Sequence, residues 1–203
     1  MTRFHTPAER LRAIPLPREM AKLPRDARGY PIPFLVLIDK SGQPQFTIND
    51  HKKAILCRKE GRCAICGRRF TNHPVSFHRE MWFVGGSRCF LHAHGAFIDP
   101  PMHYECAAYA LRVCPFLAAR RYTVRIDDAK LDPANMPDDM ALVRREGMAP
   151  ALPERFGLGL CYRYNYRPHE GIYTVPEWAY VEWWKDGEPV NAPATADPPP
   201  PPE

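Results

Sequence analysis

The chain has 203 residues, of which 45% are hydrophobic and 25% charged, which is the composition of an ordinary globular protein. Its 24 prolines exclude long uninterrupted helices and predict many loops, turns and short strands. No run of about 18 apolar residues is present, so the sequence excludes a membrane-spanning helix and predicts no membrane partner. The formal net charge of +5 is uneven, because residues 52–80 carry eight basic and two acidic side chains, whereas residues 176–203 carry one basic and six acidic ones.

The first part of the chain predicts an arm followed by a β-hairpin. Residues 1–28 are basic and interrupted by prolines, so we expect an arm that is ordered in part by docking. The segments PFLVLID (33–39) and QFTIN (45–49) have the composition of strands, and SGQP (41–44) between them is typical of a turn. Two such strands around a short turn predict an antiparallel hairpin.

The middle of the chain predicts two helices and one strand. Residues 51–60 favour a helix, with Asp50 as its N-cap and Gly61 at its end. The segment MWFVGG (81–86) is typical of a strand that ends on a glycine pair. After Asp99, which can act as a cap, two prolines and an apolar face predict a second helix that ends near the next proline.

The C-terminal part predicts a long connection and two strands. Residues 121–157 lack periodicity and are rich in Pro and Asp, so we expect a connecting segment with one short helix near Asp138–Arg145. GLCYRYNY (159–166) and the stretch 172–184 predict strands joined through RPHEG. The predicted units are a basic arm (1–28), a hairpin plus zinc domain (29–120), a connection (121–157), a strand pair (158–190) and a disordered Pro-rich tail (191–203).

The seven cysteines predict a metal site rather than a disulfide framework. The first twenty residues lack the apolar segment of a secretory signal, so we expect a reducing compartment, the cytoplasm. Disulfides are rare in such a compartment, where clustered thiols usually bind metal.

Two pairs of residues have the spacing of zinc ligands. Zinc takes four nitrogen, sulfur or oxygen ligands in a tetrahedron, and two close pairs commonly supply them. Cys63 and Cys66, followed by Gly67, form one pair, because a two-residue spacer lets both sulfurs face one point. His103 and Cys106 form the second, since positions i and i+3 at the start of a helix share one face. We therefore expect this quartet to bind Zn²⁺.

An alternative second pair has the same spacing. Cys89 and His92 could replace His103 and Cys106, although they follow a glycine turn and not a helix start. The remaining cysteines, Cys57, Cys114 and Cys161, are expected to be core thiols.

The expected zinc site is structural. Four protein ligands leave no open position for water, and binding would be coupled to folding with about 10 kcal/mol or more at stake. A knuckle, then strands, then a helix carrying the second pair is the order of a treble-clef zinc finger. The predicted fold class is therefore α+β, organised around a treble-clef-like site.

Several motifs also resemble one protein family. GYPIPFLVLID, QFTI, CAICG, FVGG, PPMHYECAAYA and CPFL occur in that order, and VEWWKDGEP follows later. Together they make residues 29–190 similar to an uncharacterised family of zinc-knuckle proteins from bacteriophages and prophage-bearing bacteria. The resemblance implies metal ligands at Cys63, Cys66, His103 and Cys106, and a location in the bacterial host cytoplasm. It also draws attention to Cys89 and Cys114, but supplies no function.

The chain departs from that family in two places. Ser87 stands where the family tends to have proline, and HAHGAF (92–97) replaces a shorter polar stretch.

Three functional hypotheses follow. The first is a non-enzymatic nucleic-acid-binding or regulatory zinc module that contacts DNA or RNA through the basic region 52–79. Phosphate contacts would come from five basic residues close to the first cysteine pair: Arg58, Lys59, Arg62, Arg68 and Arg69. The second is an HNH-like nuclease, for which His92, His94 and Asp99 are the catalytic candidates. The third is an adaptor that grips a host protein with the aromatic strands around residues 162–184.

The common phosphate-binding, dinucleotide-binding, nucleophile-elbow and deaminase motifs are absent from the sequence. We therefore favour a binding role over a catalytic one.

Overall fold

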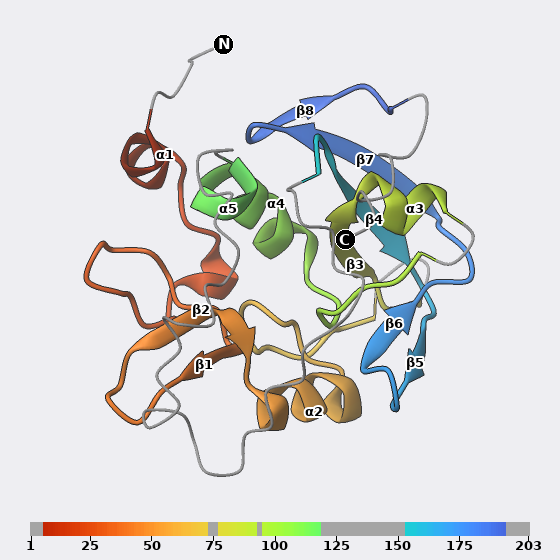
Figure 1. The fold of residues 1–203 in the computed structure, drawn as a ribbon, viewed down its shortest axis with the longest axis horizontal. Coiled ribbons are helices and arrows are strands. Elements are labelled where there is room, and N and C mark those ends of the chain that lie inside the picture. The colour runs from red at the N-terminus through yellow and green to blue at the C-terminus, as the bar shows by residue number, and fades with distance from the viewer. Residues whose placement is uncertain (1–5, 73–76, 93–94, 119–152, 194–203) are drawn as a thin grey trace, which may run out of the picture.

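The computed structural model describes residues 6–72, 77–92, 95–118 and 153–193. Its helical elements are α1 (Pro7–Ala13), η1 (Arg18–Met20), α2 (His51–Glu60), α3 (Ser87–Leu91), α4 (Tyr104–Val113) and α5 (Pro115–Ala118). Its strands are β1 (Val36–Ile38), β2 (Pro44–Asn49), β3 (Met81–Gly86), β4 (Phe156–Cys161), β5 (Asn165–Arg167), β6 (Ile172–Thr174), β7 (Tyr180–Lys185) and β8 (Glu188–Val190). The prediction of a mixed fold of helices and strands is confirmed (Figure 1).

The strands form three antiparallel sheets in the part of the chain described. β1 pairs with β2, β5 pairs with β6, and the largest sheet has the order β3-β4-β7-β8. β4 therefore lies between β3, which precedes the long connection, and β7, which follows it. In Figure 1 the four-stranded sheet lies on one side of α4, and β1, β2 and α2 lie on the other. Helix α4 consequently occupies the middle of the molecule.

The predicted N-terminal hairpin is confirmed, but its first strand is shorter than expected. β1 covers only Val36–Ile38 of the predicted segment 33–39. The backbone amides of Phe34 and Leu35 instead donate hydrogen bonds to the carbonyls of Ile65 and Ala64, at 2.7 and 2.9 Å. These carbonyls belong to the loop that carries Cys63 and Cys66, called the cysteine loop below. The first half of the segment 33–39 therefore holds the cysteine loop in place by hydrogen bonds.

The predicted helix over 51–60 is also confirmed, with its end signals. The Asp50 side chain accepts a hydrogen bond from the Lys53 amide at 3.1 Å, which satisfies a helix N-terminus donor. Gly61 ends the helix in the left-handed conformation, with φ of 62° and ψ of 56°. The chain then turns directly into the loop that carries Cys63.

The second helix begins later than predicted, and Asp99 is not its cap. Met102 exchanges two backbone hydrogen bonds with Trp82, at 2.8 and 3.0 Å, and the two prolines before it lie outside the helix. The N-cap of α4 is His103. The Asp99 carboxylate instead accepts a hydrogen bond from the Asn49 side chain at 2.7 Å.

The predicted strand over 159–166 is divided in two. β3 starts at Met81, opposite Cys161, so the chain beyond Cys161 has no further partner on that edge. It turns away from the sheet and forms β5, which pairs with β6 through the predicted RPHEG connection. The residues between β4 and β5 are therefore free to line another surface.

Two hydrophobic clusters form the core of the described residues. The larger surrounds α4 and the cysteine loop and includes Trp82, Leu158 and Trp184. The smaller is aromatic and contains Phe83, Phe97, Cys161 and Tyr173, with further rings packed against them. Glycines in β4 make room for these rings, since a Cβ at Gly159 would lie 2.5 Å from Phe90 and 2.6 Å from Trp178.

Some predictions fall outside the described residues. These are the short helix near Asp138–Arg145, most of the connection 121–157, His94, and all but the first residues of the Pro-rich tail. Among the helices that are described, none combines the length and the apolar character needed to cross a membrane.

Candidate metal centre

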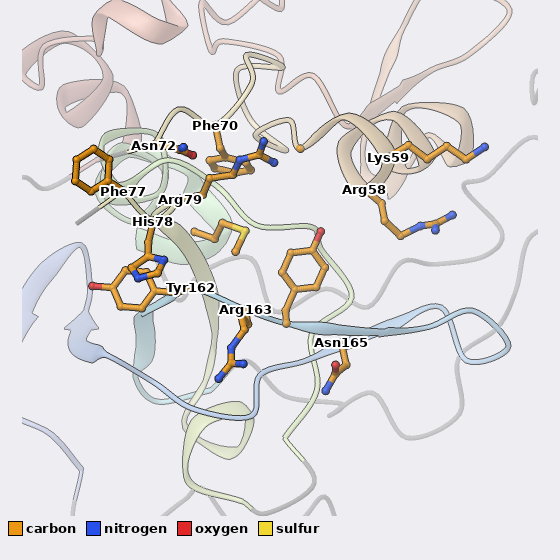
Figure 2. Close-up of a pocket in the computed structure, with 13 residues that line it drawn as sticks. Arg58, Lys59, Phe70, Asn72, Phe77, His78, Arg79, Tyr162, Arg163 and Asn165 are labelled. Carbon is orange, nitrogen blue, oxygen red and sulfur yellow. The ribbon is translucent and has the colours of Figure 1, made fainter. Parts of the chain in front are cut away.

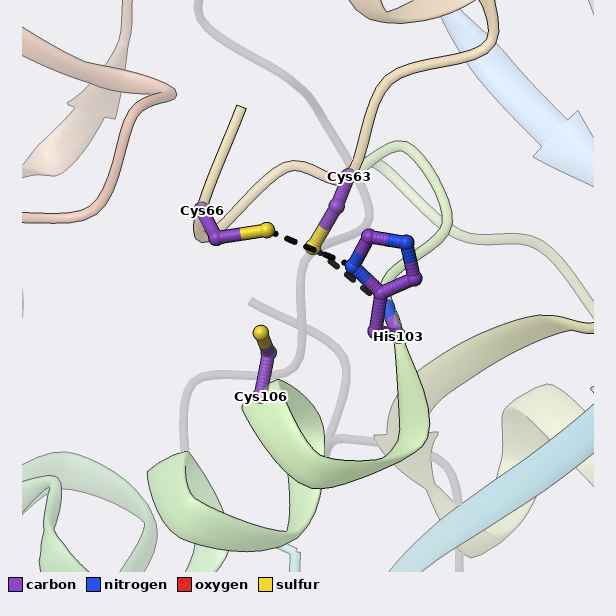
Figure 3. Close-up of side chains that lie close together, drawn as sticks. All are labelled: Cys63, Cys66, His103 and Cys106. Atoms are coloured by element: carbon purple, nitrogen blue, oxygen red, sulfur yellow. Dashed lines mark hydrogen bonds between the residues drawn. The ribbon is translucent and has the colours of Figure 1, made fainter. Parts of the chain in front are cut away.

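Four predicted ligands meet at one place in the structure. Cys63 and Cys66 come from the loop after α2, while His103 and Cys106 come from the start of α4 (Figure 3). Their ligand atoms, three thiol sulfurs and one imidazole nitrogen, all lie within 4.8 Å of one another. The quartet can therefore hold one metal ion, and it joins two segments that are distant in the sequence.

The donor atoms fit a tetrahedral ion. With Zn–S distances of about 2.3 Å, neighbouring sulfurs of a tetrahedral site lie about 3.8 Å apart. The ligand atoms lie within 4.8 Å of one another, so the quartet would contract by up to about 1 Å to bind such an ion. The Cys63 and Cys106 side chains are fully buried, each at 0% exposure, which keeps water from competing for the ion.

Local backbone geometry explains how the cysteine loop presents its sulfurs. The Gly67 amide donates to the Cys63 carbonyl at 2.9 Å, and the Cys63 amide donates to the Arg68 carbonyl at 2.9 Å. Gly67 has φ of 72°, and a Cβ there would lie 2.8 Å from the Phe34 ring. The loop therefore requires glycine at this position for two independent reasons.

The second segment is fixed by hydrogen bonds to the same sulfurs. The His103 amide donates to the Cys63 sulfur at 3.3 Å, and the His103 Nδ1 atom lies 3.3 Å from the Cys66 sulfur. The imidazole also packs edge-on against the Phe70 ring, with centroids 4.8 Å apart. His103 is thus held in a ligand position by contacts on two sides.

The thiols in this cluster differ in the direction in which their pKa values are shifted. Burial alone would raise the pKa of Cys63, but hydrogen bonds from the Cys106 and Cys66 side chains and from backbone amides lower it well below the usual range. The pKa of Cys106 is raised, first by its hydrogen bond to Cys63. Nearby, burial and then the charge of Cys63 raise the pKa of Cys57 to about 12, so Cys57 stays a neutral thiol.

The alternative second pair is not brought to the quartet. Cys89 lies in the short helix α3 and His92 is exposed at its end. Neither belongs to the group formed by Cys63 and Cys66, and within the described ranges that group is the one cluster able to hold a metal. The expected core thiols Cys57 and Cys161 are buried as predicted, and Cys114 is half-buried.

Two of the three residues proposed for an HNH-like nuclease can be located in the described part of the chain. His92 is exposed at the end of α3, Asp99 binds Asn49, and His94 lies outside the described residues. No second metal-ligand cluster accompanies them in the described part of the chain.

The five basic residues predicted to contact phosphate divide into three groups. Arg62 and Arg69 both form ion pairs with Glu60 at 2.8 Å, and their hydrogen bonds lower the Glu60 pKa. Arg62 also donates to the Gly67 carbonyl at 2.9 Å, so it supports the cysteine loop. Arg58 and Lys59, in contrast, line a groove of about 520 Å³ next to the metal centre (Figure 2). Arg68 is exposed outside that groove.

This groove, called the basic groove below, is built from three segments. α2 supplies two cations, the segment before β3 supplies one, and the segment between β4 and β5 supplies another. The four cations are Arg58, Lys59, Arg79 and Arg163. Rings and amides complete the lining, among them Phe70, Phe77, His78, Tyr162, Asn72 and Asn165. None of the described residues that line the groove is acidic.

Sequence reasoning overlooked part of the groove. His78, Tyr162 and Arg163 were not among the residues predicted to contact nucleic acid, since their proximity to α2 depends on the pairing of β3 with β4. The alternation of aromatic and basic residues in YRYNYR (162–167) is the signal that could have indicated them.

The aromatic residues predicted as a protein-gripping surface are largely buried. Trp183 and Trp184 are 6% and 1% exposed and belong to the core. Tyr162 and Tyr180 remain exposed, but only Tyr162 lines the basic groove. The structure therefore uses most of these rings for packing.

No family model, curated protein or solved structure matches this chain. The metal centre and the basic groove are therefore the features that indicate a function.

Proposed function

We propose that this chain is a zinc-stabilised, non-enzymatic nucleic-acid-binding module. Three thiolates and one imidazole are the donor set that structural zinc prefers, and four protein ligands leave no position for a reactive water. The treble-clef arrangement is part of this proposal, since a knuckle, a strand and a helix follow one another in the expected order. Phage or prophage origin and a bacterial cytoplasmic location stay predictions from the motif resemblance.

The observation that supports nucleic acid as the partner is the charge of the basic groove. Four cations line it without a carboxylate among the described lining residues. Lys59, Arg79 and Arg163 form no ion pair with any described residue, whereas Arg62 and Arg69 share Glu60. Cations that have no acidic partner among the described residues and surround a concave surface attract a polyanion, and phosphate contacts supply most of the affinity of such proteins.

The metal centre and the basic groove have residues in common. Phe70 packs against the ligand His103 and also lines the groove. Gly61, another lining residue, accepts a hydrogen bond from the Phe70 amide at 2.8 Å. A Cβ at Gly61 would lie 3.1 Å from the Arg79 guanidinium, so this cation rests against the same turn. We therefore expect zinc to hold one wall of the groove in place.

A salt titration tests this function. Fluorescence anisotropy with a labelled 16-nucleotide DNA or RNA strand and a 16-bp duplex would measure binding by the zinc-loaded chain. Four phosphate contacts predict a loss of affinity of about 50- to 150-fold between 50 and 200 mM salt. Absence of binding to every probe, or affinity that does not change with salt, would refute the proposed function.

A matched pair of double variants locates the surface. Lys59→Ala with Arg163→Ala removes two groove cations and should lower the slope of log affinity against log salt by about 1.4 to 1.8. Lys22→Ala with Arg12→Ala changes the net charge equally but leaves the groove lining intact. Equal effects of the two double variants would show that the groove is not the binding surface.

A further inference from the structure

The basic groove exposes aromatic rings beside its cations. Phe77 is 75% exposed and Tyr162 is 40% exposed, and both line the groove. Next to Tyr162 lies the His78 ring, with centroids 5.3 Å apart (Figure 2). An exposed phenylalanine costs free energy in water, so rings in this position favour a ligand that covers them.

The shape of the groove limits which form of nucleic acid can reach these rings. In a duplex the base faces are stacked inside a convex cylinder, and side chains meet only base edges and backbone. The rings here line a concavity of about 520 Å³, which is the size of a small-ligand site. A base can enter it only when it is unpaired and unstacked from its neighbours.

The arrangement of the groove also matches what a single strand requires. Figure 2 shows Phe77, His78 and Tyr162 together on one side of the groove and Arg58 and Lys59 of α2 on the other, with Arg163 between them, so a strand that covers the rings can reach the cations along the groove. Asn72 and Asn165 add amide donors and acceptors at exposed positions that a base edge could use.

From these observations we infer that the basic groove binds single-stranded nucleic acid, with unpaired bases stacked on Tyr162 and Phe77 and phosphates held by Arg58, Lys59 and Arg163. This inference rests on the proposed function and narrows it to one class of ligand. Stacking on aromatic side chains tolerates any base, so the groove selects strandedness more strongly than sequence.

The test compares strandedness and stacking in the same zinc-loaded, full-length protein. Labelled single-stranded DNA, single-stranded RNA and the corresponding duplexes are titrated by fluorescence anisotropy, and the two single strands identify the preferred sugar. We expect at least one single strand to bind about tenfold or more tightly than its duplex. Tyr162→Leu should weaken that binding about 5- to 100-fold, whereas Tyr162→Phe, which keeps the ring, should leave it nearly unchanged.

Two further variants separate stacking from general damage. Phe77→Leu should weaken single-strand binding, because the ring is exposed and contributes little to the core. Tyr180→Leu removes another exposed ring, 54% exposed, that does not line the groove, and should have no effect. Unchanged thermal melting and zinc content of each variant confirm that the fold is intact.

The possible failures can be told apart. Equal affinity for single strands and duplexes, together with wild-type binding by Tyr162→Leu and Phe77→Leu, overturns the inference but leaves the proposed function standing. No binding of any nucleic acid by the zinc-loaded protein overturns both.

Discussion

Cys63, Cys106 and Cys161 are equally buried, but the regions around them differ. Cys63 and Cys106 lie within 4.8 Å of two further ligand atoms, on two chain segments that also meet in the larger hydrophobic cluster and through a few hydrogen bonds. Cys161 is 0% exposed among aromatic rings and receives a hydrogen bond from the Arg163 amide. The neighbours of a buried thiol, and not its burial, therefore decide whether it can bind a metal or only packs in the core.

The largest difference is expected when the metal ligands are removed. Cys106→Ser, or chelation of the wild-type chain, should abolish about 10 kcal/mol of coupled binding and folding energy, comparable to the whole stability of a typical domain. Cys161→Ala should cost only about 0.5–3 kcal/mol. Hydrogen exchange measured by mass spectrometry should show residues 61–70 and the first turn of α4 losing protection in the first case only.

Loss of protection to the same extent and in the same segments in Cys106→Ser and Cys161→Ala would contradict the account. Zinc content measured on the same samples provides the control.

The aromatic region should instead be sensitive to added volume. Gly159→Ala places a methyl group 2.5–2.6 Å from Phe90 and Trp178, and overpacking of this kind costs about 1–3 kcal/mol. Urea unfolding would measure the loss in free energy. Adding Phe90→Leu to Gly159→Ala should recover part of it, because the smaller side chain makes room. A double variant less stable than the sum of both single changes would refute this packing explanation.

The two regions should also differ at alkaline pH. Burial raises the pKa of Cys161 to about 12, while a thiol in an unfolded chain titrates near about 8.5. Between these two pKa values the Cys161 thiol keeps its proton in the folded state and loses it in the unfolded state. The free energy of unfolding that the buried thiol contributes is therefore fully present below pH about 8.5 and is lost as the pH rises toward about 12. The stability difference between wild type and Cys161→Ala should shrink by about 1.4 kcal/mol per pH unit in that window.

Urea unfolding at pH 8, 9 and 10 checks this alkaline effect. A stability difference between the two proteins that stays constant across the series would show that the Cys161 thiol does not titrate as a buried group.

The smallest effect is expected at the start of α2, the helix that carries two groove cations. Asp50→Ala removes the side chain that accepts from the Lys53 amide and should cost about 1 kcal/mol. Asp50→Asn keeps a capping oxygen and should cost much less. Thermal unfolding of the two variants would decide, and identical losses would mean that the cap contributes nothing.

Local signals explain what could be predicted from the sequence. The spacing of Cys63, Cys66, His103 and Cys106 identified the candidate quartet, since ligand geometry demands residues of that type in two close pairs. The ends of α2 were predictable for the same reason, because a capping Asp and a left-handed Gly act through neighbouring backbone groups.

Long-range pairing explains what could not be predicted. The start of α4 depends on the hydrogen bonds between Met102 and Trp82, which pair the residue before the helix cap with a distant strand. The basic groove depends on the pairing of β3 with β4, which brings Arg163 and Tyr162 to Arg79 from a distant part of the chain. No local pattern in the sequence predicts which strands pair.

Native mass spectrometry of the full-length chain tests the central claim most directly, because it counts bound metal on the folded protein. We expect one zinc ion on the wild-type chain and on Cys161→Ser, and none on Cys106→Ser. Folded wild-type protein without zinc, or Cys106→Ser that retains a zinc ion as firmly as wild type, would contradict the account.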